Sequence, residues 1–188
     1  MNTEQIRTGG RLFPFTRALI CAQALIALFF AAPALAAPGD EEFARGYDAY
    51  DARQFTEAVA LWRKAANLGH AREQNGLGLL YRDGIGVKKD DKEAVRWLLE
   101  SASRGYALGM FNLALMYKDG TGVMRNDIEA YKWFYLASTI NFDEKAEFER
   151  NALSSRMSEA QRRAARERAQ EWFDRFFFGR TMNERVKK

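Results

Sequence analysis

Cysteine and histidine are almost absent from this sequence. Its 188 residues include one cysteine, Cys21, and one histidine, His70. A zinc site needs several of these side chains close together, and a disulfide bond within the chain needs two cysteines. The composition therefore argues against a metal site, and nothing in the sequence indicates a cofactor.

A large surplus of one charge sign is also missing. The chain has 29 lysines and arginines against 25 aspartates and glutamates, and the two signs are well mixed over residues 40–142. A nucleic-acid-binding protein normally concentrates basic charge on one face. We therefore expect a protein or peptide as the partner, and not a nucleic acid.

The first 36 residues have the pattern of a secretory signal peptide. Three arginines precede an apolar run that begins at Ala18, and Pro33 and a small-residue stretch follow. Cleavage after Ala36 would remove Cys21 and leave a mature chain without a thiol. This predicts a periplasmic or secreted protein. The alternative is an uncleaved anchor, because residues 18–37 approach the length of a spanning helix.

Residues 71–106 and 107–142 are two copies of one 36-residue unit. Twelve positions match in register, among them Leu77 with Leu113 and Trp97 with Trp133. A fixed period of this length indicates stacked structural units, each of which buries its apolar face against its neighbours. The apolar spacing predicts two helices in each unit.

A glycine-containing loop separates the two expected helices. It reads Asp-Gly-Ile-Gly-Val from Asp83 and Asp-Gly-Thr-Gly-Val from Asp119. No strand pattern precedes it, so a phosphate-binding loop is not indicated. We expect Gly84 and Gly120 to end the first helices in the left-handed conformation, and Asp91 and Asp127 to cap the second helices.

Residues 40–70 contain a shorter third copy, in which Gly46, Ala58 and Trp62 have the spacing of a tetratricopeptide unit. The two complete units resemble the Sel-one-like repeat family, with its Tyr-x-x-Gly-x-Gly-Val turn and its Ala-x-x-Trp second helix, and the resemblance covers residues 40–142. This resemblance implies an all-α solenoid of helix-turn-helix repeats over residues 37–142, divided at 40–70, 71–106 and 107–142.

Residues 143–180 are expected to form C-terminal capping helices, followed by a basic tail at 181–188. Ser158 begins a capping-box sequence. An apolar stripe runs along the last helix: Ala160, Ala164, Ala165, Ala169, Trp172, Phe173, Phe176 and Phe177. The stripe suits the end of a solenoid. The alternative is a basic amphipathic helix that binds a membrane or the envelope surface.

Two groups of residues invite a catalytic interpretation. His70 has Tyr106 and Phe142 at the equivalent repeat positions, which indicates packing. Asp90 and Asp91 could serve a hydrolase of envelope polymers, but they lie where a helix is expected to begin, and there carboxylates stabilise the helix. We therefore expect no enzyme and no catalytic residue, with the hydrolase as the alternative.

The resemblance also implies a groove lined by the first helix of each unit. It assigns partner contacts to seven residues: Tyr47, Tyr50, Arg72, Asn75, Arg82, Phe111 and Lys118. Aromatic and cationic side chains together suit a protein or peptide partner. The expected function is that of a non-enzymatic adaptor or assembly factor in a bacterial envelope.

Overall fold

The computed structural model describes residues 40–141 and 144–186, which form eight helices and no strand. The helices are α2 (Asp40–Asp51), α3 (Phe55–Asn67), α4 (Ala71–Asp83), α5 (Asp91–Ser103), α6 (Ala107–Asp119), α7 (Asp127–Asn141), α8 (Glu144–Ser154) and α9 (Glu159–Val186). The predicted all-α repeat fold is confirmed. The predicted signal peptide lies outside the described residues.

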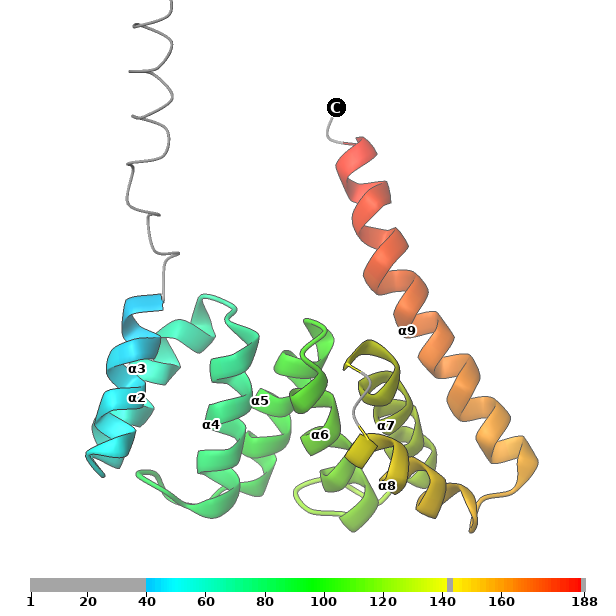
Figure 1. The fold of residues 1–188 in the computed structure, drawn as a ribbon, viewed down its shortest axis with the longest axis horizontal. Coiled ribbons are helices and arrows are strands. Elements are labelled where there is room, and N and C mark those ends of the chain that lie inside the picture. Colours follow the sequence, from blue (N-terminus) through cyan, green and yellow to red (C-terminus); the bar gives the residue numbers. More distant parts are fainter. Residues whose placement is uncertain (1–39, 142–143, 187–188) are drawn as a thin grey trace, which may run out of the picture. The chain divides into compact units, whose positions relative to one another are not determined.

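The helices pack as consecutive antiparallel pairs, α2 with α3, α4 with α5 and α6 with α7, and each pair packs on the next (Figure 1). Small residues allow the close approach within a pair. A Cβ added to Gly78 would lie 2.7 Å from Cγ of Leu98, and one added to Gly46 would collide with Trp62. The small-large pairing of Gly46 and Trp62 therefore holds α2 against α3, as its spacing predicted.

The double-glycine loop within each full unit packs against the preceding unit. Gly84 and Gly120 end α4 and α6 with φ of 71° and 73°, which confirms the prediction of left-handed caps. The second glycine of each loop, Gly86 or Gly122, also has positive φ, and it lies against the start of the second helix in the preceding unit, at Phe55 or Asp91. A side chain at either position would separate two units, which explains why the motif has two glycines.

The predicted N-caps are wrong by one residue. Asp90, not Asp91, caps α5 by accepting hydrogen bonds from the backbone N–H groups of Lys92 and Glu93, at 3.0 and 3.1 Å. Asn126, not Asp127, does the same for α7. A cap residue must lie outside the helix, and Asp90 has the extended backbone (φ −149°) that this requires.

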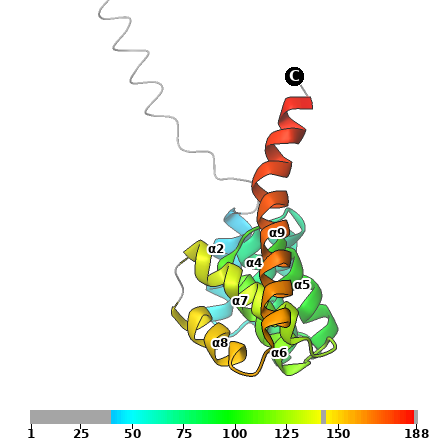
Figure 2. The same cartoon turned by 90° about the vertical axis from the view of Figure 1, so that its right-hand side faces the viewer.

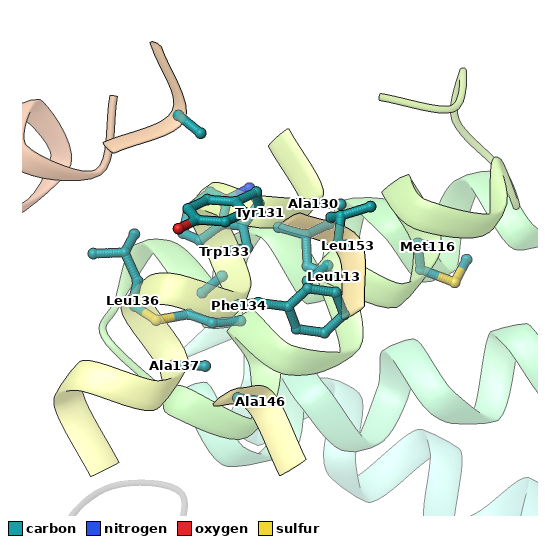
Figure 3. Close-up of a cluster of buried hydrophobic side chains, with 14 of the residues drawn as sticks. Leu113, Met116, Ala130, Tyr131, Trp133, Phe134, Leu136, Ala137, Ala146 and Leu153 are labelled. Atoms are coloured by element: carbon teal, nitrogen blue, oxygen red, sulfur yellow. The ribbon is translucent and has the colours of Figure 1, made fainter. Parts of the chain in front are cut away.

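The largest buried cluster spans the last two units and the C-terminal helices (Figure 3). Phe134, Leu113 and Leu136 belong to it and are at most 1% exposed, and Trp133 is 3% exposed. Ala146 and Leu153 extend the cluster into α8. One continuous core therefore runs from α5 to α9.

Helix α9 packs on α7 at the end of the repeats (Figure 2). The predicted capping box begins it, because Ser158 and Gln161 exchange side-chain hydrogen bonds with each other's backbone N–H groups. Of the predicted stripe, Ala165 and Ala169 are buried, whereas Ala160 and Phe177 are exposed. The stripe therefore covers the repeats only along its central part.

Charged contacts fix the cap to the last unit. Arg156 donates to Asp127 at 3.2 Å, and Arg168 donates to Glu129 at 2.8 Å. Trp172 makes an edge contact with Trp133, with 6.2 Å between ring centroids. Among the helices that the structure describes, none has the length and apolar character needed to cross a membrane.

Candidate partner-binding surface

The first helices of the two full units lie beside each other and leave one stripe of each helix accessible. Direct packing joins α4 to α6, and Nδ2 of Asn112 donates to Oδ1 of Asn75 at 2.8 Å in this contact. Positions three or four residues apart share a helix face. We call the accessible residues at this spacing the first-helix face: Arg72, Leu79 and Arg82 on α4, with Leu108, Phe111, Leu115 and Lys118 on α6.

Arg82 lies at the C-terminal end of α4, paired with its neighbour. Its Nε and Nη2 donate to the two carboxylate oxygens of Asp83 at 2.7 and 2.9 Å. This hydrogen-bonded pairing holds the pKa of Asp83 below its usual range and raises the pKa of Arg82. The pair is about one-third exposed, so it offers a fixed guanidinium at the end of the face.

Lys118 occupies the position on α6 that corresponds to Arg82 on α4. Its Nζ donates to Oε2 of Glu149 in α8 at 2.9 Å. The pair lines a cavity of about 480 Å³, together with Arg125, Arg156 and other residues of the α6–α7 loop and α8. Lysine and glutamate are both about one-quarter exposed, so the pair ties α8 to α6 and remains accessible.

Apolar side chains occupy the start and the middle of α6 on this face. The ring of Phe111 packs edge-on against Phe134, with 5.6 Å between centroids, and remains half-buried. Leu108, one turn earlier, is 44% exposed. The face therefore combines apolar surface on α6 with cations on α4 and at the end of α6, which suits a peptide or protein surface with apolar and acidic residues.

Three of the seven predicted contact residues do not belong to the first-helix face. Tyr50 is half-buried and stacks on Trp62, with 5.6 Å between centroids. Asn75 is 5% exposed because it bonds to Asn112 between the units. Tyr47 is 48% exposed on α2, outside the two helices of the first-helix face. The structure thus gives Tyr50 and Asn75 packing contacts, and Arg72, Arg82, Phe111 and Lys118 share the face.

The sequence interpretation missed Leu108 and Glu149. Leu108 stands one repeat after Arg72, so the register alone was enough to find it. Glu149 lies beyond the repeats, and only its contact with Lys118 identifies it. Phe148, which precedes Glu149, is also exposed (72%).

The side chains with catalytic potential have structural roles here. Asp90 caps α5, and Oδ1 of Asp91 lies 3.6 Å from Nζ of Lys89. Both aspartates line a cavity of about 850 Å³ beside the α4–α5 loop. His70 and Tyr106 hold equivalent positions before α4 and α6, with nearly identical backbone angles. Within the described ranges, no group of three or more histidine, cysteine, aspartate or glutamate residues could hold a metal ion.

This arrangement of stacked helix pairs with an accessible first-helix face defines an α-helical repeat scaffold. The Sel1 repeat profile matches residues 43–70, 74–106 and 107–141, and the chain belongs to the Sel1 repeat family. Proteins of this family generally mediate protein–protein interaction and are typically non-enzymatic. No curated protein matches the chain.

Among the solved structures that share the fold are two repeat proteins. One is a protective antigen of uropathogenic Escherichia coli strains with an SLR fold, which is 25% identical over 81% of this chain, with a TM-score of 0.71. The other is a Sel1 repeat protein from Oxalobacter formigenes, 34% identical over 59% of the chain, with a TM-score of 0.56. The aligned region spans 33% of the first protein and 45% of the second.

Proposed function

We propose that the chain is an exported, non-enzymatic adaptor or assembly factor of a bacterial envelope. In this proposal it binds a protein or peptide partner through the first-helix face. The observation that carries the proposal is the accessible apolar surface of this face, with Leu108 44% exposed on α6 and Arg72, Arg82 and Lys118 on the same face. The family and its scaffold fold support the same class of function.

The binding surface is tested by reversing charge on α4. We would first isolate a partner by affinity capture from envelope extracts, purify it, and measure its dissociation constant for the purified chain. The double variant Arg72→Glu/Arg82→Glu should weaken binding at least about tenfold, because charge-assisted contacts become repulsive. Its helical circular dichroism should remain unchanged.

A matched control keeps the change in net charge the same. Arg53→Glu/Arg163→Glu reverses two exposed arginines outside the first-helix face, so it should bind like the unmodified chain. Equal affinity of both double variants and the unmodified chain would refute the assignment of the face. Equal weakening of both would mean that only overall charge matters.

Export has its own test. Expression of the full chain with a C-terminal tag, followed by cell fractionation and intact mass measurement, should recover a product that lacks residues 1–36. Full-length protein in the membrane fraction would instead favour the uncleaved anchor. Full-length protein in the cytoplasm would refute export.

Contact with a membrane through the end of α9 is a second candidate. The observation that favours it is the exposure of Phe177 and Phe178, at 44% and 61%. Exposed aromatic rings beside basic residues suit a lipid interface. Flotation with anionic vesicles should then be lost in Phe177→Ser/Phe178→Ser. Flotation that is absent in the unmodified chain would remove this candidate.

A further inference from the structure

A cavity of about 370 Å³ lies where α5 turns into α6, beside the end of α7. Its lining consists of Gly105, Tyr106, Ala107, Leu108, Ile140 and Asn141. Leu108 also belongs to the first-helix face, so the cavity adjoins one end of that face. The lining is apolar apart from the Asn141 amide, the Tyr106 hydroxyl and backbone groups. Ligand cavities begin at about 300 Å³, so this one suits a single large side chain.

The turn that forms the cavity is firmly held. The backbone N–H of Gly105 donates to the carbonyl of Ala102 at 3.0 Å, and that of Tyr106 donates to Ser101 at 3.3 Å. Phe176 of α9 packs on the turn, because a Cβ added to Gly105 would lie 2.7 Å from its Cζ. A cavity with fixed walls loses little conformational freedom when a side chain enters it.

The residue that precedes the cavity turn in the sequence is a cation without an ion-pair partner among the described residues. Arg104 directly precedes Gly105 and is exposed, and its guanidinium extends over the preceding turn, near Gly69. Other arginines of the repeats, such as Arg82 and Arg96, pair with adjacent acidic residues. Over residues 40–141 and 144–186, no acidic side chain forms an ion pair with Arg104. Arg104 is therefore available to a carboxylate from outside the chain.

We infer that this cavity and Arg104 together bind a short peptide segment in which a leucine, methionine or phenylalanine stands one or two residues from an aspartate or glutamate. The apolar side chain enters the cavity beside Leu108 and Ile140, and the carboxylate accepts hydrogen bonds from Arg104. The inference rests on the proposed function as a peptide or protein binder. It adds the chemistry of the motif that such a partner carries.

The test uses a phage-displayed library of random 12-residue peptides, selected on the purified chain and counter-selected on Leu108→Glu. Enriched peptides should share an apolar residue close to an acidic one. Fluorescence polarisation of a labelled enriched peptide then gives its affinity for each variant. Leu108→Glu and Arg104→Glu should each bind at least about tenfold more weakly, because one blocks the cavity and the other repels the carboxylate.

Two further variants control for folding and for general surface effects. Leu99→Glu introduces the same change at a leucine of matched exposure (43%) on α5, outside the cavity, and should bind like the unmodified chain. Leu108→Ser tests the cavity without adding charge and should also bind more weakly. Far-ultraviolet circular dichroism and thermal unfolding of all variants should coincide.

Several outcomes overturn the inference. Enriched peptides without an acidic residue would refute the role of Arg104 in binding. Unchanged affinity for Leu108→Glu would show that the cavity does not bind the peptide. If enriched peptides lose affinity only for Arg72→Glu/Arg82→Glu, the inference fails and the proposed function stands. If no peptide is enriched, the inference fails, and the capture experiment with folded partners still decides the proposed function.

Discussion

Replacing Trp133 with alanine tests how the last repeat holds the cap. Trp133 is 3% exposed, and its ring contacts Trp172 of α9. Nζ of Lys132 lies over the same ring, 4.2 Å from its centroid. The indole therefore joins α7 to α9 and shields the core from solvent, and its removal should destabilise both the last unit and the cap.

The expected loss follows from burial and from one unpaired group. Truncating a buried tryptophan to alanine costs about 3–5 kcal/mol through lost apolar burial and the remaining cavity. The indole Nε1 of Trp133 is buried without a hydrogen-bond partner, and such a group destabilises the folded state by about 1–3 kcal/mol. Because the variant also removes this group, we expect a loss at the lower end of the truncation range, about 3 kcal/mol. Trp133→Phe keeps a ring against Trp172 and should lose about 1 kcal/mol or less.

Urea unfolding followed by circular dichroism measures the difference. With a slope of about 2 kcal/mol/M, a loss of about 3 kcal/mol lowers the midpoint by about 1.5 M. Hydrogen exchange should show that the backbone of α9 loses protection in Trp133→Ala. An unchanged midpoint with α9 fully protected would refute the reasoning. A phenylalanine variant as unstable as the alanine variant would show that the ring contact with Trp172 contributes nothing.

Three further perturbations test the caps, the loops and the charges. Asp90→Ala should lower the free energy of unfolding in urea by about 1 kcal/mol, because Asp90 caps α5. Asp91→Ala should lower it clearly less, and equal losses in the two variants would contradict the assignment of the cap. Gly120→Ala should cost about 1–2 kcal/mol in thermal unfolding because φ is 73° there, whereas Gly179→Ala, within α9, should be neutral or stabilising. Although partial burial opposes ionisation, hydrogen bonds from two arginines hold the pKa of Asp127 below its usual value. The stabilising effect of these hydrogen bonds is complete above the unfolded-state pKa of about 4 and is lost as the pH falls toward the lower folded-state pKa. In Asp127→Asn the urea midpoint should therefore decrease less steeply with falling pH than in the unmodified chain. Parallel curves of urea midpoint against pH for the two proteins would contradict this expectation.

The repeat architecture was predictable because its determinants are local and occur twice. Helical spacing, the glycines at positive φ and the small residues facing Trp62 or Leu98 each act within one unit or between adjacent units. The second copy confirms the register of the first. The N-caps were missed because Asp90 and Asp91 are both good cap residues, and sequence alone does not fix the last non-helical backbone position.

The candidate surface was predictable only in part, because it depends on contacts between units. Spacing places Asn75 and Arg82 on one side of α4, but burial by Asn112 removes Asn75 from the accessible surface. The partner of Lys118 lies in α8, outside the repeat period. The cavity at Gly105 also depends on Phe176, which is more than 70 residues further along the chain.

The contact between the cap and α7 has a consequence for how such chains change in length. The cap contacts Glu129 and Trp133, and Lys132 lies over that tryptophan. One period earlier, α5 carries Glu93, Arg96 and Trp97 at the same positions, and Arg96 lies over Trp97 in the same way. The docking surface for the cap is thus part of the repeated motif. A whole unit can be deleted or duplicated by recombination, and the new last unit still presents a glutamate and a tryptophan to the same terminal helix.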